Sequence, residues 1–219
     1  MQKISAATLM VLPLKFVFGD PLKLVRLGEY DTRHDPDCQA DQCAPPVQDR
    51  GLAKIIPHES FNEPSFHNDI AILKLDRPVE LNGFVNTICL PKNDELQDQM
   101  QTRKTAVTAG WGKMNMTTAA HAYVLQFVQL PVLDGDSCYE MMGRTNLTNS
   151  IICAGAKVNQ DTCTGDSGGP LMKVFDTDDG PKSFLVGVVS FGASVCGIKA
   201  PGVYTSLFFF RKWILDHIL

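Results

Sequence analysis

Residues 161–170 read Asp-Thr-Cys-Thr-Gly-Asp-Ser-Gly-Gly-Pro, so the serine at position 167 has glycines close by on both sides. Glycine tolerates backbone conformations that other residues avoid, and its presence here favours a sharply turned loop that exposes the hydroxyl of Ser167. Such a loop leaves backbone N–H groups free to face a developing oxyanion. The segment therefore indicates nucleophilic attack by Ser167 on a carbonyl group, with a glycine-rich structural turn as the alternative.

Gly165-x-Ser167-x-Gly169 also satisfies the nucleophile-elbow pattern of the α/β-hydrolases, and a downstream aspartate and His217 complete the chain order of that fold. In that fold the serine turn must run into a helix. Here Pro170 leads into the strand-like Leu-Met-Lys-Val-Phe, and the chain shows no alternation of β and α units. The context thus excludes an α/β-hydrolase.

The elements that must hold this loop are mostly short strands. Runs rich in Val, Ile, Leu and Phe recur between turn-forming clusters, at 22–30, 53–58, 70–75, 105–110, 124–133, 184–192 and 202–207. This spacing is typical of a β-sandwich or β-barrel. The polar segment 176–181 predicts a hairpin tip. Only the C-terminal end has helical spacing, with Phe209, Trp213 and Ile214 on one stripe.

The composition of the chain excludes some classes of binding partner. The chain has 219 residues, is 44% hydrophobic and carries a formal net charge of -4, which is too mild a balance for a nucleic-acid binder or a basic membrane-surface protein. The longest apolar run, Ile4–Leu14, falls well short of the ~20 residues that span a bilayer. That run could be part of a weak signal peptide, although Lys15, which closes it, interrupts the region that should stay apolar. A disordered or artefactual lead segment is the alternative.

Seven cysteines without C-x-x-C spacing indicate an oxidising compartment. Two sequons, at Asn115 and Asn146, fall in polar stretches that would tolerate a glycan. Together these features favour a secreted, extracellular glycoprotein.

The segment 161–170 resembles the active-site serine motif of the chymotrypsin/trypsin-like serine protease family. The resemblance makes Ser167 the nucleophile and places the oxyanion hole at the N–H groups of Gly165 and Ser167. The segment His67–Leu75 resembles the family's aspartate strand, so Asp69 would orient the catalytic imidazole. Three further segments fall in family order, namely Thr108–Gly112, Ile151–Gly155 and Pro201–Tyr204.

Substrate specificity also follows from the resemblance. Asp161, six residues before the serine, matches the pocket-floor aspartate of trypsin-like members and would select an Arg or Lys side chain by charge pairing. Gly192 and Gly202 match the pocket walls. Ser190 begins Ser-Phe-Gly, a modest departure from the commoner Ser-Trp-Gly, and we expect it to contact the extended substrate.

The resemblance pairs Cys138 with Cys153 and Cys163 with Cys196. Cys38 and Cys43 are similar to the extra local bridge of arthropod clip-domain proteases, to which the chain is closest. In those proteases the position of Cys89 is bonded to the activation propeptide, so Cys89 has no partner here.

The acidic loop from Glu29 to Asp49 occupies the position of the calcium loop in some relatives. Carboxylate oxygens suit calcium, but the spacing fixes no coordination set. The pattern therefore favours a solvated loop and no required cofactor, with calcium at Glu29 as the alternative.

The family also needs a general-base histidine before Asp69 and an activation site whose freed amine pairs with Asp166. Neither is visible, because His34, His58 and His67 lack the expected Ala-His-Cys context and no Ile-Val-Gly-Gly string occurs upstream. His121, in Thr-Thr-Ala-Ala-His-Ala-Tyr, looks like the missing histidine. It follows Asp69 in the chain, however, so we expect it to lie in a surface loop of the second barrel and not to be catalytic.

The predicted fold is all-β, with two six-stranded antiparallel Greek-key barrels of trypsin-like type, the first incomplete, and a C-terminal helix. The expected divisions are a lead segment at 1–20 and a protease domain at 21–219, comprising a first barrel at 21–100, a second at 101–208 and the helix at 209–219. The amino-terminal part with the histidine is expected to be missing or replaced, which would leave open strand edges.

Two functions remain open. One is a secreted trypsin-like serine endopeptidase of an extracellular proteolytic cascade, cleaving protein substrates after Arg or Lys, monomeric and subject to serpin inhibitors. The other is a non-catalytic protease homologue that binds cascade partners, because removing the base leaves only weak residual catalysis. No nucleic-acid or membrane partner is expected for either.

Overall fold

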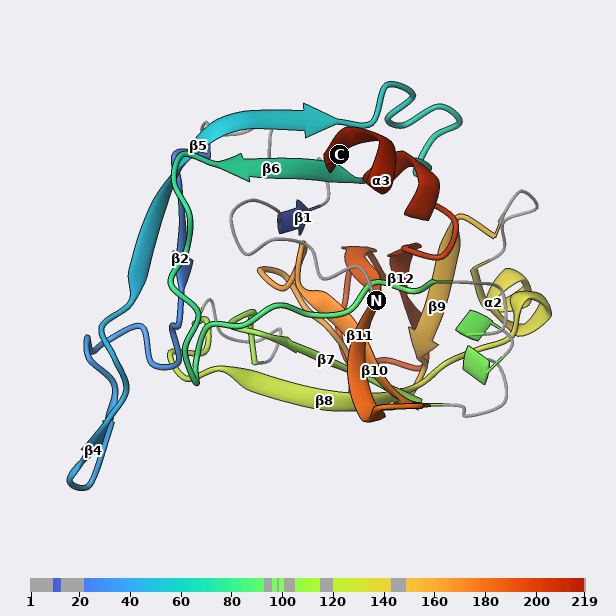
Figure 1. The fold of residues 1–219 in the computed structure, drawn as a ribbon. Helices are drawn as coiled ribbons and strands as arrows, with labels where there is room; N and C mark the ends of the chain where they lie inside the picture. The colour runs from blue at the N-terminus through green and yellow to red at the C-terminus, as the bar shows by residue number, and fades with distance from the viewer. Residues whose placement is uncertain are drawn as a thin grey trace.

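The computed structural model describes residues 10–12, 22–92, 96–97, 99–100, 105–114, 120–142 and 149–218. Two antiparallel sheets dominate this part of the chain (Figure 1). The elements in chain order are β1 (Met10–Leu12), β2 (Leu24–Leu27), β3 (Cys38–Gln39), β4 (Gln42–Cys43), β5 (Gln48–Pro57), β6 (Ala71–Leu75), β7 (Thr105–Gly110), β8 (Gln126–Pro131), α2 (Gly135–Met142), β9 (Ile151–Gly155), β10 (Pro170–Thr177), β11 (Gly180–Phe191), β12 (Pro201–Ser206) and α3 (Arg211–Ile218).

The six-stranded sheet has the order β8-β7-β10-β11-β12-β9. Side chains in β10 alternate between buried and less buried positions, which places Leu171 and Phe175 in the core of this sheet as expected from a period of two. Thr177 pairs with Gly180 across the turn between β10 and β11, so the hairpin tip predicted at 176–181 is confirmed. The pairing of β11 with β12 shifts register between Val189 and Phe191, which leaves Ser190 at an irregularity of the strand.

Within the described residues the smaller sheet has the order β1-β6-β5-β2, so the first barrel is represented there by a four-stranded half-barrel, in agreement with the prediction of an incomplete first barrel. Its apolar face gathers Val25, Leu73 and Leu75. The strand β1 lies inside the expected lead segment and pairs with β6 from Met10↔Leu73 to Leu12↔Ala71. The edges of this sheet are therefore β1 and β2. The short β3–β4 hairpin extends away from both sheets (Figure 1).

The C-terminal helix α3 packs against both sheets. Its Ile214 is fully buried in a cluster with Phe210, Ile70 before β6, and Val188 of β11. The predicted C-terminal helix is thus confirmed, beginning two residues later than expected. No helix among the described residues is long and apolar enough to cross a membrane.

The helix α2 was not predicted. It is short, and Cys138 is its only buried residue, so it carries no clear apolar stripe. Its start is stabilised by Asp134, whose carboxylate accepts a hydrogen bond of 2.7 Å from the Ser137 N–H. The disulfide between Cys138 and Cys153 ties α2 to β9.

Candidate active site

The segment around Ser167 forms a tight turn that enters the strand β10. Gly165 and Gly168 have φ angles of 102° and 87°, a region that glycine occupies without the penalty of a Cβ atom. The turn is closed by the Asp166 N–H donating to the Cys163 carbonyl at 2.9 Å, and it is tied to β11 by the Gly168 N–H donating to the Val189 carbonyl at 2.9 Å. Because the turn leads into a strand, it differs from the elbow of an α/β-hydrolase.

Two backbone donors flank Asp166. Within the described part of the chain, neither the Gly165 nor the Ser167 N–H donates a hydrogen bond to another protein group. Unused donors beside a serine hydroxyl are the arrangement that stabilises an oxyanion. The turn can therefore hold negative charge on an oxygen bonded near Ser167.

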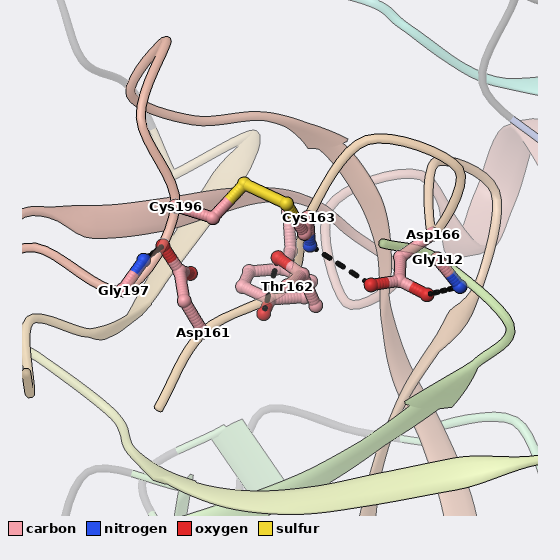
Figure 2. The surroundings of a disulfide bond; sticks show 8 residues. Gly112, Asp161, Thr162, Cys163, Asp166, Cys196 and Gly197 are labelled. Carbon is pink, nitrogen blue, oxygen red and sulfur yellow. Dashed lines mark hydrogen bonds between the residues drawn. A yellow bond between two sulfur atoms is a disulfide. The ribbon is translucent and has the colours of Figure 1, made fainter. Parts of the chain in front are cut away.

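The side chain of Asp166 lies between Gly112 and Cys163 (Figure 2). Its carboxylate accepts hydrogen bonds of 2.8 Å from the Gly112 N–H and 2.8 Å from the Cys163 N–H. A Cβ on Gly110 or Gly112 would lie 2.2 Å or 2.5 Å from an oxygen of this carboxylate. Glycine is thus required in Ala-Gly-Trp-Gly because Asp166 fills the space.

Asp69 lies at the junction of the two sheets, 3% exposed and two residues before β6. Its Oδ2 accepts a hydrogen bond of 2.5 Å from Ser190 Oγ, and its backbone carbonyl accepts one of 2.7 Å from Thr205 Oγ1. Val189, next to Ser190, carries the backbone bonds to the serine turn. Asp69 and Ser167 are therefore both anchored at neighbouring residues of β11.

The environment of Asp161 differs from that of Asp166, since the two carboxylates point to opposite sides of the Cys163–Cys196 disulfide (Figure 2). Oδ2 of Asp161 accepts a hydrogen bond of 3.2 Å from the Gly197 N–H. Oδ1 is buried and has no hydrogen-bond partner in the described residues. Burial raises the pKa of Asp161, partly offset by the amides of Gly197 and Thr162. An unsatisfied buried carboxylate oxygen favours a cationic partner.

Gly192 and Gly202 face each other, because a Cβ on Gly192 would lie 3.7 Å from the Cα of Gly202. A Cβ on Gly202 would lie 3.2 Å from Oγ1 of Thr162, the residue after Asp161. The two glycines therefore lie next to each other, with Gly202 beside the residue that follows Asp161. The hydroxyl of Ser190 donates its hydrogen bond to Asp69, which leaves the backbone of Ser190 for the substrate contact that the sequence predicts.

A cavity of about 180 Å³ runs between β7, β8 and the serine turn and reaches both Asp161 and Asp166. Its lining residues are Thr108, Ala109, Gly110, Gly112, Lys113, Met114, Gln126, Phe127, Val128, Asp161, Thr162 and Asp166. No local pattern predicts this cavity, because its walls come from three separate segments of the chain.

The five histidines lie in several different parts of the described structure. His34 lies 3.4 Å from an Asp31 carboxylate oxygen, and Nδ1 of His67 lies 3.1 Å from the Ser65 carbonyl oxygen. His58 and His217 both stack on Trp213 of α3. In the described residues the Ser167 hydroxyl has no hydrogen bond to any of them.

His121 is exposed and lies in the loop between β7 and β8, where the sequence placed it. Its imidazole nevertheless packs against Gly165. A Cβ on Gly165 would lie 2.6 Å from Cε1 and 2.7 Å from Nδ1 of His121. Sequence reasoning missed this contact, since nothing local to either segment signals it.

Three disulfides are present, and they join the same cysteines that the resemblance pairs: Cys38 with Cys43, Cys138 with Cys153, and Cys163 with Cys196. Cys89 is a free cysteine of intermediate exposure. The sequon residues Asn115 and Asn146 lie outside the described residues.

The acidic loop contains two buried carboxylate oxygens without a hydrogen-bond partner, Oε2 of Glu29 and Oδ1 of Asp37. The first lies 3.5 Å from an Arg26 guanidinium nitrogen. Oδ2 of Asp37 accepts hydrogen bonds from the N–H groups of Tyr30 at 3.0 Å and Asp31 at 3.2 Å. Among the described residues, no group of three or more His, Cys, Asp or Glu side chains is placed to hold a metal ion.

Comparison with known proteins gives consistent results for sequence and structure. The family model described as Trypsin matches residues 25–214. The chain is 38% identical over 205 residues to "CLIP domain-containing serine protease HP8" of Bombyx mori, covering 90% of this chain and 54% of that protein. It is 39% identical over 207 residues to "Spaetzle-processing enzyme" of Drosophila melanogaster, covering 90% and 51%.

Among solved structures, the chain is similar to the crystal structure of the Drosophila Grass clip serine protease of the Toll pathway, with a TM-score of 0.85 and 32% sequence identity. That match covers 98% of this chain and 62% of the solved chain. The present chain spans about half the length of the curated relatives it matches.

Proposed function

Because this chain belongs to the trypsin family of serine proteases and is similar to insect clip-domain members, we propose that it is a secreted endopeptidase of an extracellular proteolytic cascade that cleaves protein substrates after Arg or Lys. The observation that carries the specificity is the buried, unpartnered Oδ1 of Asp161. A guanidinium or ammonium group entering between Gly192 and Gly202 would supply the missing partner.

The chemistry assigned to the site is acyl transfer. Ser167 Oγ attacks the carbonyl carbon that follows the bound Arg or Lys, and the carbonyl oxygen becomes an oxyanion held by the N–H groups of Gly165 and Ser167. Collapse of this intermediate expels the amine, which takes up a proton, and leaves an acyl-Ser167 ester. Water then attacks the ester and releases the new carboxyl end.

The proton of Ser167 needs a base. In this family the base is a histidine oriented by the aspartate that Asp69 matches, and in the described structure no histidine is hydrogen-bonded to Ser167. We therefore assign to the chain the nucleophile, the oxyanion donors and the specificity pocket, and expect slow turnover without an added base.

The same observation favours a second function, that of a non-catalytic homologue which binds cascade partners through the Asp161 pocket. Binding needs the charged pocket but no proton transfer. The two functions therefore differ in turnover and agree in affinity for cationic side chains.

The acidic loop adds a proposal about a metal ion. Oε2 of Glu29 and Oδ1 of Asp37, which accept no hydrogen bond in the described residues, are hard ligands of the kind calcium prefers, and backbone carbonyl oxygens would have to complete the set. The ion would satisfy two buried carboxylates and hold the loop against the second barrel. The positive charge of Arg26 beside Glu29 opposes it.

The test of function is the turnover of an arginyl ester and an arginyl amide by the purified chain, with Ser167→Ala prepared alongside. Turnover that disappears in Ser167→Ala supports the peptidase. Benzamidine binding without turnover supports the homologue. If the folded chain neither turns over substrate nor binds benzamidine, both functions are wrong.

A further inference from the structure

Three backbone segments meet beside the serine turn. Lys113 and His121 are antiparallel bridge partners, and the Ala122 N–H donates to the Gly112 carbonyl at 3.1 Å. On its other side, the Lys113 N–H donates to the Thr164 carbonyl at 2.9 Å. The segment 112–113 is thus held between the His121 segment and the turn that carries Ser167.

The bond from Lys113 sets the direction of the Gly165 N–H. The Thr164 carbonyl and the Gly165 N–H belong to one planar peptide group, and in a trans peptide they point in opposite directions. The cis peptides of the described chain precede Pro36 and Pro64, so this peptide is trans. Because Lys113 holds the carbonyl, the Gly165 N–H points away from Lys113.

The ring of His121 restricts the rotation that remains to the peptide between Thr164 and Gly165. Glycine at 165, with φ of 102°, has no side chain to resist rotation of the peptide on either side of it. The imidazole lies where a Cβ would be, since that atom would come within 2.6 Å of Cε1. A ring in van der Waals contact with the Cα limits the movement that would turn the N–H aside.

His121 is itself held from the first barrel. The Thr32 N–H donates to the Tyr123 carbonyl at 3.0 Å, and the Leu125 N–H donates to the Tyr30 carbonyl at 2.8 Å. Ala122, next to His121, is 6% exposed. The backbone from His121 to Leu125 is therefore held by segment 112–113 and by the acidic loop.

We propose that His121 is a positioning residue, whose ring holds Gly165 so that its N–H faces the oxygen that becomes negative during attack by Ser167. The inference rests on the oxyanion role assigned to Gly165 under the proposed function. His121 touches no reacting atom in this account and acts only through Gly165. The chain thus uses the histidine that resembles a general base as a support for the oxyanion donor.

The test uses two probes of the intact chain. Benzamidine carries an amidinium group, so its affinity depends only on the Asp161 pocket. An arginine-like boronic acid also accepts Ser167 Oγ on boron, releasing the serine proton to solvent, and places one oxygen of the tetrahedral boronate against the oxyanion donors. Affinities for both are measured for the wild type, His121→Ala, His121→Phe and Phe84→Ala. The last removes a ring that is 62% exposed elsewhere on the surface.

We expect His121→Ala to weaken boronate binding by about tenfold and to leave benzamidine affinity unchanged. The tenfold effect is smaller than the effect of removing an oxyanion donor altogether. His121→Phe, which retains a planar ring, restores most of the boronate affinity, and Phe84→Ala changes neither probe. In spectra of ¹⁵N-glycine-labelled protein, His121→Ala shifts or broadens the Gly165 amide signal, and His121→Phe returns it.

Unchanged boronate affinity and an unchanged Gly165 signal in His121→Ala would overturn the proposal. An equal loss of affinity for benzamidine and for the boronic acid would also overturn the proposal. The ring would then support the whole serine turn and not the Gly165 N–H in particular. A wild type that binds neither probe counts against the proposed function. In that case the Gly165 signal alone decides whether His121 holds this peptide.

Discussion

The hydroxyl of Ser190 donates a 2.5 Å hydrogen bond to Oδ2 of the buried Asp69, across the junction between the two sheets. Ser190 sits where the β11–β12 register shifts, and such irregularities redirect a side chain. The bond supplies a donor to a carboxylate that is 3% exposed. Asp69 therefore depends on the second barrel for its orientation.

Replacing Ser190 with alanine should lower the free energy of unfolding by about 1–3 kcal/mol, because a buried carboxylate oxygen loses a donor. Ser183→Ala, at an exposed position of the same strand, is the matched control and should have little effect. Urea unfolding of the two variants and the wild type measures the difference. Equal stability of Ser190→Ala and Ser183→Ala would show that the bond contributes nothing.

Asp161→Asn should abolish benzamidine binding and stabilise the free protein at neutral pH. Burial raises the pKa of Asp161 above 3.8, so the folded state holds this proton more tightly than the unfolded state does. The charged form therefore costs stability at pH 7, and the cost fades as the pH falls toward 4. We expect Tm to rise by about 2 °C at pH 7 and by less at pH 4.

Asp178→Asn, at an exposed position of the β10–β11 hairpin, serves as the control for Asp161→Asn. It should alter neither benzamidine affinity nor Tm. Destabilisation of Asp161→Asn at pH 7 would mean that the carboxylate has a stabilising partner.

Gly112→Ala should destabilise the serine turn. Its Cβ would lie 2.5 Å from both oxygens and the carboxyl carbon of Asp166, so that side chain would have to move. We expect a loss of about 2 kcal/mol in urea unfolding, as for other overpacked sites. Gly83→Ala is the control, because a Cβ there meets no atom within 4 Å. Similar stability of the two variants would contradict the packing of Asp166 against Gly112.

Calcium should raise Tm if Glu29 and Asp37 hold the ion. At roughly a hundredfold excess over its dissociation constant, a single bound ion stabilises by about 2.7 kcal/mol. Glu29→Gln should remove the response, while the exposed Glu80→Gln should keep it. Thermal unfolding in chelator and in calcium makes the comparison, and a wild type without any response refutes the site.

Acid should weaken the attachment of α3 through His58. The His58 ring packs 5.3 Å from Phe210 and 5.1 Å from Trp213 between ring centroids. Burial lowers the pKa of His58 below 6.5, and the nearby charge of His217 adds to the shift while Glu59 opposes it. At pH values near and below 6.5 the unfolded state therefore binds more protons than the folded state. The free energy of unfolding falls as the pH drops from 7 to 5.

Urea unfolding at pH 7 and pH 5 tests this dependence. We expect His58→Gln to lose less stability on acidification than the wild type, whereas His34→Gln, changed at an exposed histidine, behaves as the wild type. An identical pH dependence in all three proteins would exclude His58 as the source.

The sequence was sufficient to predict the local chemistry of this protein. The order of the short motifs identified the family, and the run of glycines around Ser167 predicted a turn that the φ angles of Gly165 and Gly168 bear out. Short runs rich in Val, Ile, Leu and Phe predicted most strands, and the polar turn residues predicted the hairpin at 176–181, because both signals are local. The helix α2 could not be predicted from its sequence pattern, because it is stabilised by Asp134 and a disulfide more than by an apolar stripe.

Only the tertiary structure decided which distant groups meet. Ser190 and Asp69 are 121 residues apart in the chain, and no local pattern predicts the hydrogen bond between their side chains. The contact of His121 with Gly165 likewise joins two loops that no local pattern connects. A sequence fixes side-chain type and local conformation, whereas the partner of a polar group or a ring depends on how separate strands bring their loops together.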